Sequence, residues 1–286
     1  MQLQAFAKIN LDLRILGRRD DGYHEVRTIL QTIDWPDEIR MEPAERFEFV
    51  EHGVEAGEDN LVVKAVRAFE NLTGNTVRAR IELFKHVPAG AGLGGGSADA
   101  AVTLLGLQRL LGQDIPQSEM LRALGAIGSD IPFFIFGGQA LGTGRGNKIT
   151  PIEDDAGYAL LVVVPEITIS TREAYSWLTT SDKSNTIKRF CGQQVSSSAE
   201  AERGNDFESV VFPRHPLLRT IKNELLGAGA RRAALSGTGS AIFGVFGSAE
   251  EAERAVPRVA SLGKVKVTRP LSRPEYLRKI WGVAKW

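Results

Sequence analysis

The chain of 286 residues has a single cysteine, Cys191, so no disulfide can form within it. It also has no excess of either charge, because 35 lysine and arginine residues balance 35 aspartate and glutamate residues. A balanced charge argues against broad electrostatic partners such as duplex nucleic acid or an anionic membrane. We therefore expect neither partner, and the lack of disulfides favours a reducing, cytoplasmic setting.

Long hydrophobic runs are also missing from the sequence. The longest runs, such as residues 159–164, are far too short to span a bilayer. The first residues lack the apolar core of a signal peptide, which agrees with the expected cytoplasmic location. With 43% hydrophobic and 24% charged residues, the chain has the composition of a globular protein with one large or two modest domains.

Glycine is concentrated in one segment, where five of the nine residues from Gly90 to Ala98 are glycine. A strand-like run, 80–84, precedes the segment and a helix-like run, 98–111, follows it. Unpaired N–H groups and the helix dipole favour an anion at a helix start, and glycine lets the backbone come close to it. A surface turn would need only one or two glycines. The sequence therefore predicts a phosphate-binding loop, formed by Pro88, Ala89, Gly90, Ala91, Gly92, Leu93, Gly94, Gly95, Gly96, Ser97 and Ala98.

Two common phosphate-binding motifs do not fit this loop. No Gly-Lys-Ser/Thr follows the glycines, which excludes a Walker A motif. Gly90, Gly92 and Gly95 satisfy the dinucleotide fingerprint, but that fingerprint also requires an acidic residue about 20 positions further on, after a second strand. Asp114 has this spacing but lies in a predicted loop after a helix. A dinucleotide-binding oxidoreductase is therefore a weak alternative.

The segment 88–97 resembles the ATP-binding loop of the GHMP kinases, the superfamily of galactokinase, homoserine kinase, mevalonate kinase and phosphomevalonate kinase. The triple glycine followed by Ser-x-Asp-Ala-Ala is similar to the branch that phosphorylates a cytidine diphosphate derivative of methylerythritol. Many relatives have a second serine where this chain has Ala98. The resemblance implies transfer of the γ-phosphoryl group of ATP, with Mg2+, to the 2-hydroxyl of that small molecule in non-mevalonate isoprenoid synthesis.

Apolar residues alternate with polar ones over 9–15, which predicts a strand with one buried face. Lys8, Asn10 and Asp12 share the other face, which in an ordinary strand is solvated. This strand resembles the opening of the same kinase family. The resemblance implies that Lys8 contributes to catalysis and that Asn10 lies close to the substrate.

Asp130 stands two residues before Pro132, a spacing that fits a helix N-cap. The surrounding Gly-x-Asp-x-Pro-Phe-Phe also resembles the kinase family. The resemblance implies that Asp130 accepts the proton of the substrate hydroxyl, while Lys8 orients Asp130 and offsets negative charge in the transition state.

Arg-x-Asp-Gly-Tyr-His, which ends at Tyr23 and His24, is similar to the cytidyl-handling branch rather than to GHMP kinases at large. Without the resemblance, the pair would be a half-buried start of a strand. The resemblance implies that the Tyr23 ring packs on cytosine, that His24 hydrogen-bonds the base, and that Tyr175 packs on its other side. Aromatic faces and ring nitrogens are suited to this task.

Several other segments carry weaker predictions. The Ser-Gly-Thr-Gly-Ser sequence at 236–240 predicts a hairpin turn, and the resemblance implies that Gly237, Thr238 and Gly239 approach the substrate's phosphates. Asn60 predicts a helix N-cap, and 34–58 suggests hairpin-like strands. The stretch from Asn205 resembles a family motif. The polar segment 180–204 and the basic tail after Arg269 match nothing specific.

The resemblance implies an α+β, two-lobed GHMP kinase fold. Its N-terminal lobe, 1–157, would be ribosomal-protein-S5-like and bind ATP, and its C-terminal lobe, 158–286, would be ferredoxin-like. We expect a monomer or weak homodimer and leave the Mg2+ ligands unassigned. Two alternatives remain: a GHMP kinase for another alcohol such as homoserine or mevalonate, against which Tyr23 and His24 argue, and a non-catalytic nucleotide sensor, against which Lys8 and Asp130 argue.

Overall fold

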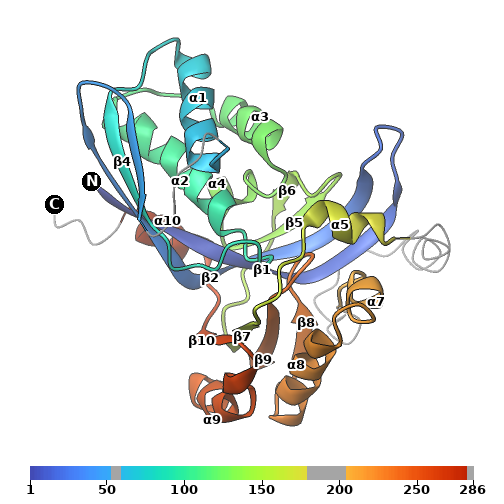
Figure 1. Ribbon diagram of the computed structural model, residues 1–286. Coiled ribbons are helices and arrows are strands. Elements are labelled where there is room, and N and C mark those ends of the chain that lie inside the picture. The colour runs from blue at the N-terminus through green and yellow to red at the C-terminus, as the bar shows by residue number, and fades with distance from the viewer. Residues whose placement is uncertain (53–58, 179–203, 282–286) are drawn as a thin grey trace.

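The computed structural model describes residues 1–52, 59–178 and 204–281, which form two sheets with helices packed on them (Figure 1). The first half of the chain supplies the larger sheet and the second half the smaller one. No helix within these ranges is long and apolar enough to cross a membrane. The polar segment 180–204 of the sequence analysis lies outside the described residues up to residue 203. The boundary between the two lobes at residue 157 stays a prediction.

The larger sheet has the strand order β3-β4-β2-β5-β6, and β1 pairs with β2 outside this path. The long β1–β2 pair is antiparallel, with register shifts next to Lys8 and Asn10. β4 lies between β2 and β3, so residues 34–43 and 48–52 do not pair with each other and the hairpin-like strands predicted over 34–58 are wrong. The strands of this sheet are β1 (Gln2–Arg18), β2 (His24–Pro43), β3 (Glu48–His52), β4 (Ala79–Phe84), β5 (Gln139–Thr143) and β6 (Lys148–Pro151).

The helices between β3 and β5 lie on one side of this sheet (Figure 1). The Asn60 side chain accepts a hydrogen bond of 2.8 Å from the N–H of Val62 at the start of the first helix, which confirms the predicted N-cap. The second helix is buried almost all round, because it packs between the sheet and the first helix. The helices are α1 (Leu61–Thr73), α2 (Gly95–Leu110), α3 (Gln117–Ile127) and α4 (Phe133–Phe136).

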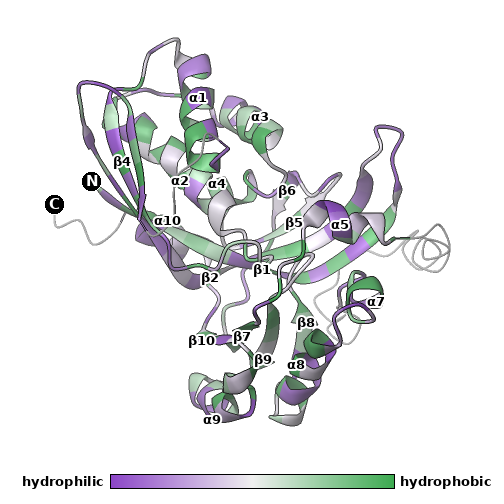
Figure 2. Ribbon diagram, viewed as in Figure 1, coloured by the Kyte–Doolittle hydropathy of each residue, from purple (hydrophilic) through white to green (hydrophobic). Residues whose placement is uncertain are grey.

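The smaller sheet is antiparallel, with the order β10-β7-β9-β8. Every residue of β7 is buried, and Figure 2 shows β9 as largely hydrophobic, whereas β10 alternates lysine with valine. Its elements are β7 (Ala159–Val164), α5 (Thr171–Ser176), α7 (Glu208–Val211), α8 (Pro216–Gly227), β8 (Arg232–Leu235), β9 (Ile242–Phe246), α9 (Ala249–Val259), the short helix η3 (Ala260–Leu262) and β10 (Lys264–Thr268).

The basic tail returns to the first lobe as helix α10 (Arg273–Ile280), which the sequence left unassigned. Tyr276 of this helix is fully buried in the same core as Phe6 and Phe134. Its ring lies edge-on to Phe6, and its hydroxyl donates a hydrogen bond of 2.6 Å to the carbonyl of Phe134. Burial raises the pKa of the Tyr276 hydroxyl, which therefore stays protonated.

Candidate active site

Both faces of β1 are buried, including the one that the sequence predicts to be solvated in an ordinary strand. Lys8, Asn10 and Asp12 are all buried. Lys8 donates hydrogen bonds to the side-chain oxygen of Asn10 at 2.7 Å and to the backbone carbonyl of Gly92 at 2.9 Å. The polar face is therefore covered by loops from other parts of the chain.

Asp130 forms the third contact of Lys8. Its carboxylate lies 3.2 Å from Lys8 Nζ, and the Asp130 side chain is 39% exposed whereas that of Lys8 is 3% exposed. The predicted helix-capping role is wrong, because α4 begins after Pro132 without a side-chain cap. The carboxylate is instead held by a buried ammonium group and remains open to a ligand.

The segment 88–98, here called the first glycine loop, joins β4 to α2. Gly90, Gly92 and Gly94 have φ angles of 68°, 77° and 69°, in the left-handed region that favours glycine. The helix begins at Gly95 without a side-chain cap, so Ser97 lies within its first turn and does not cap it. The N–H groups at this helix start are therefore available to an anion.

The segment 236–240, here called the second glycine loop, joins β8 to β9 and touches the first loop. A Cβ atom on Gly92 would collide with the backbone carbonyl of Ser236, so the two backbones are in close contact. A Cβ atom on Gly237 would lie 3.2 Å from the side-chain oxygen of Asn10 and 3.5 Å from Lys8 Nζ. The second lobe thus brings its glycines directly against the Lys8–Asn10 pair.

A cavity of about 650 Å³ opens between these loops. Its lining joins groups that are far apart in sequence, and it has the size of a small-molecule site. Leu93 and Ala98 of the first loop are buried in the cores instead. The predicted site residues that line the cavity are Lys8, Asn10, Pro88, Ala89, Gly90, Ala91, Gly92, Gly94, Gly95, Gly96, Ser97, Asp130, Tyr175, Gly237, Thr238 and Gly239.

Of the three aromatic residues predicted to hold a base, only Tyr175 lines the cavity. The rings of His24 and Tyr175 stack with centroids 5.0 Å apart. Tyr23 is 55% exposed, with the guanidinium of Arg145 over its ring at 4.4 Å. Burial, together with the negative charge of Asp130, raises the pKa of Tyr175 to about 12.

A buried charged cluster behind the first glycine loop was not predicted. Lys85 Nζ lies 2.5 Å from a carboxylate oxygen of Asp37 and 2.7 Å from a carboxylate oxygen of Asp99. The other carboxylate oxygen of Asp37 accepts hydrogen bonds from the backbone N–H groups of His86 and Val87. Lys85 and Asp99 also line the cavity. The motif that contains Asp99 was visible in the sequence, whereas no pattern singled out Asp37.

Two carboxylates share one ammonium group in this cluster. Burial raises the pKa of Asp99 well above its usual range, and the nearby Asp37 raises it further against the opposing effect of Lys85. Burial alone would lower the pKa of Lys85, but the charges of Asp99 and Asp37 outweigh it and raise that pKa. The ammonium group is therefore firmly charged.

The described residues contain no group of three or more His, Cys, Asp or Glu side chains that could hold a metal ion. Mg2+ in kinase sites keeps waters and takes most of its other ligands from substrate phosphates, with one or two protein oxygens. The cavity supplies oxygens of this kind, from Ser97 and Asp130, beside the first glycine loop. The site therefore fits an ion that arrives with a nucleotide.

Comparison with known proteins agrees with this geometry. Residues 60–138 match the GHMP kinases N terminal domain and residues 187–264 match the GHMP kinases C terminal domain. The chain is 41% identical over 289 residues to the 4-diphosphocytidyl-2-C-methyl-D-erythritol kinase of Solibacter usitatus, covering 98% of this chain and 91% of the relative. This chain belongs to the 4-diphosphocytidyl-2-C-methyl-D-erythritol kinase family of the GHMP kinases. It is therefore a kinase of a class that uses ATP.

Another relative and two solved structures are also similar to this chain in sequence or in fold. The enzyme of the same name from Caldanaerobacter subterraneus subsp. tengcongensis is 37% identical, covering 89% of this chain and 91% of the relative. A crystal structure of 4-(cytidine 5'-diphospho)-2C-methyl-D-erythritol kinase superposes with a TM-score of 0.80 at 28% identity, covering 94% of this chain and 99% of the other. Homoserine kinase from Cytophaga hutchinsonii, at 17% identity and a TM-score of 0.69 over 95% of each chain, shares the fold. The predicted α+β GHMP kinase fold is confirmed.

Proposed function

We propose that the protein transfers the γ-phosphoryl group of ATP to the 2-hydroxyl of 4-diphosphocytidyl-2-C-methyl-D-erythritol, in the non-mevalonate route to isoprenoid precursors. The names of the relatives at 37% to 41% identity support this substrate. The observation that carries the proposal is the contact of 3.2 Å between buried Lys8 Nζ and the exposed carboxylate of Asp130, in the wall of a cavity that both glycine loops line.

In the proposed reaction, Asp130 accepts the proton of the substrate hydroxyl. Its carboxylate faces the cavity and is held at one side by Lys8, so it is oriented without being enclosed. Lys8 also offsets negative charge that develops during transfer. Phosphoryl transfer depends mainly on positioning and on charge stabilisation of this kind.

We assign the nucleotide phosphates to the first glycine loop. The uncapped start of α2 offers N–H groups and the positive end of a helix of 16 residues. The hydroxyl of Ser97, in the first turn, would contribute to holding Mg2+ beside phosphate and water oxygens. When bound, Mg2+ neutralises charge on the phosphates.

We assign the cytosine to the aromatic residues Tyr23, His24 and Tyr175. Rings with centroids 5.0 Å apart leave no room for a third ring between them, so a base would pack beside the His24–Tyr175 pair rather than inside it. Tyr23 has an exposed ring that can cover the base from another side. Gly237, Thr238 and Gly239, which line the cavity, would approach the diphosphate.

A coupled assay of ADP release tests the proposed substrate. We expect turnover with 4-diphosphocytidyl-2-C-methyl-D-erythritol and none with CDP, mevalonate or homoserine. Turnover with another alcohol instead would discard the roles of Tyr23 and His24. ATP binding in calorimetry without any turnover would favour a nucleotide sensor.

The same assay tests the proposed chemistry through Asp130→Asn and Lys8→Ala. Each should lower kcat by about 100-fold or more, because each removes a group that acts in the transition state, and ATP binding should remain. Lys148→Ala and Asp155→Asn are matched controls, since both side chains are exposed and lie outside the cavity lining. Full activity in either test variant would refute the assignment.

A further inference from the structure

We propose that Ser236 is a positioning residue that fixes the ammonium group of Lys8 through the backbone carbonyl of Gly92. The inference rests on the role proposed above for Lys8. Ser236 lies in the second glycine loop and is 0% exposed. It does not line the cavity, so it acts on the reaction only through other residues.

The hydroxyl group of Ser236 forms hydrogen bonds with both β1 and the first glycine loop. Its hydroxyl donates to the carbonyl oxygen of Gly92 at 2.9 Å and accepts the backbone N–H of Asn10 at 3.3 Å. Lys8 Nζ donates to the same Gly92 oxygen at 2.9 Å. One carbonyl oxygen therefore receives the hydroxyl of one lobe and the ammonium group of the other.

The position of a lysine ammonium group depends on its acceptors, because four rotatable bonds connect it to the backbone. Lys8 Nζ has two close acceptors, the side-chain oxygen of Asn10 and the carbonyl of Gly92, and it reaches Asp130 at 3.2 Å. Gly92 is in the left-handed region, within a loop rich in glycine. A second donor on its carbonyl fixes the direction of that carbonyl and hence the place of the ammonium group.

Ser236 is itself held firmly on both sides. Its N–H donates to the carbonyl of Ala241 at 2.9 Å, and its carbonyl accepts the N–H of Gly239 at the same distance. The side-chain amide of Asn205 donates to the carbonyls of Leu235 at 2.8 Å and Gly237 at 2.6 Å, which flank Ser236. These hydrogen bonds fix the backbone of Ser236 and therefore the position from which its hydroxyl group extends.

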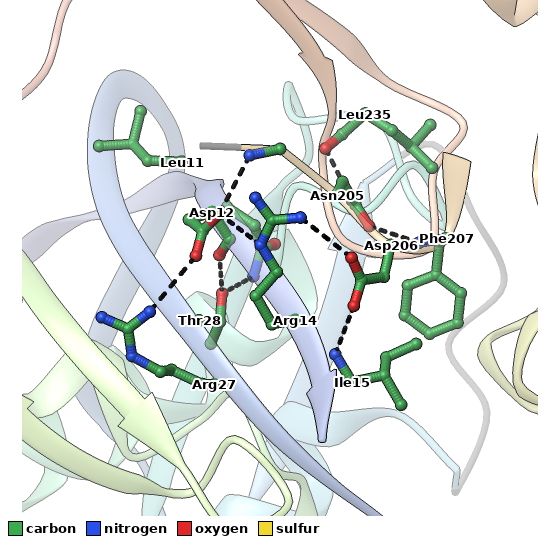
Figure 3. Close-up of polar contacts among 12 residues, drawn as sticks. Leu11, Asp12, Arg14, Ile15, Arg27, Thr28, Asn205, Asp206, Phe207 and Leu235 are labelled. Carbon is green, nitrogen blue, oxygen red and sulfur yellow. Dashed lines mark hydrogen bonds and ion pairs between the residues drawn. The ribbon is translucent and has the colours of Figure 1, made fainter. Parts of the chain in front are cut away.

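The residues next to Asn205 contact the strand that carries Lys8, as Figure 3 shows for Asp206. The carboxylate of the adjacent Asp206 accepts the N–H of Ile15 at 2.8 Å and pairs with Arg14 at 3.1 Å. Asp12 accepts the N–H of Gly204 at 3.0 Å. Ser236 is therefore positioned relative to β1, which is the strand whose side chain it is proposed to place.

Ser240 provides a matched control within the same loop. It is 1% exposed, and within the described ranges its hydroxyl has no hydrogen-bond partner. Ser240→Ala removes the same atom from the same depth as Ser236→Ala, but without removing a hydrogen bond. Any difference between the two variants therefore reports on the Ser236 contacts.

We would measure kcat, KM and the ATP dissociation constant for both variants. Ser236→Ala should lower kcat about 10-fold or more, because small displacements of a catalytic group have effects of this order, with ATP affinity within about twofold. Ser240→Ala should stay within about twofold in every constant. Ser236→Cys, which keeps a weak donor, should have an intermediate kcat. Equal kcat values for the two alanine variants would overturn the proposal.

A second comparison links the effect to Lys8. In a Lys8→Ala background, Ser236→Ala has no ammonium group left to position, so the residual kcat should change less than about twofold. A further loss of about 10-fold would show that Ser236 acts by another route. If the Lys8→Ala variant had the full kcat, the proposed function itself would fail. If Lys8→Ala lost its activity while Ser236→Ala kept a normal kcat, only the positioning role of Ser236 would be rejected.

Discussion

The two glycine loops meet at one cavity but are held in place differently. The first loop leads from a strand into a helix, and behind it lie the charged groups of Lys85, Asp37 and Asp99. The second loop connects two strands of a hairpin and is held by the neutral amide of Asn205. The loop proposed to bind phosphate leads into a helix start without a side-chain cap, and its support comes from side chains behind it.

The difference in charge has a consequence for each loop. A neutral amide gives the same support at any ordinary pH, whereas the buried carboxyl group of Asp99, whose pKa burial raises, changes its charge with pH. Asp37 fixes the entry to the first loop by accepting the N–H groups of His86 and Val87. The first loop should therefore be the more sensitive of the two to pH.

The largest effect should come from Gly92→Ala, which disturbs both loops at once. An alanine there would have to adopt a φ of 77°, and its Cβ would collide with the carbonyl of Ser236. We expect a loss of about 2 kcal/mol or more in the free energy of unfolding, measured in urea, with loss of activity.

Gly96→Ala is the matched control for stability. It lies in the first turn of α2, and the nearest atom to its Cβ would be a methyl carbon of Leu61 at 3.5 Å. Alanine favours a helix over glycine, so the free energy of unfolding should change by about 1 kcal/mol at most. Equal losses in the two variants would show that the loops do not depend on their close contact.

A smaller effect is expected from Asn205→Ala, which removes the neutral support of the second loop. The carbonyls of Leu235 and Gly237 and the N–H of Phe207 would lose their partner, at a cost of about 1–3 kcal/mol in unfolding free energy. KM for the cytidyl substrate should rise more than KM for ATP, because Gly237, Thr238 and Gly239 of the second loop are proposed to contact that substrate.

Asn205→Asp sharpens the same test. A carboxylate of nearly the same shape would face two carbonyl oxygens without a proton to donate, so we expect it to be at least as unstable as Asn205→Ala. Asn75→Ala, at an exposed position, should change neither stability nor KM by a measurable amount. A stable Asn205→Asp variant with normal KM would contradict the assigned support.

The smallest effect should come from Asp99→Asn and should appear in the pH dependence of stability. The pKa of Asp99 is higher in the folded state than its ordinary value, which applies to the unfolded chain. The group therefore stabilises the fold at a pH below the ordinary pKa, and this contribution is lost as the pH rises through the folded-state pKa. The amide does not titrate, so urea unfolding from pH 4 to pH 8 should show a smaller loss of stability with rising pH in the variant. Equal pH dependence would argue that the cluster does not titrate in this range.

The fold was predicted from the resemblance to the GHMP kinases, whose motifs occur in this chain in the same order, whereas local patterns predicted single features such as the Asn60 cap. Burial was harder to predict. The period of two placed Lys8 and Asn10 on one face of β1, but whether that face meets water depends on loops from residues 92 and 236–237. Asp37 was missed for the same reason, because its partners lie 48 to 50 residues away.

The helix N-cap predicted at Asp130 does not form, and Ser97 does not cap α2 either. Ser97 and Asp130 have side chains suited to capping helices, yet the helices begin at other positions. Gly94 adopts a φ of 69° at the start of α2, which a side-chain cap would not require. Both polar side chains are thereby left to face the cavity.

Helix α10 also bears on the order in which the protein folds during synthesis. Tyr276 fills the core of the first lobe beside Phe6 and Phe134, and a Cβ on Gly137 would overlap its ring. A ribosome makes the strands and helices of that lobe well before it makes residues 273–280. The first lobe therefore emerges with part of its core open, and it can close only after the second lobe has been translated.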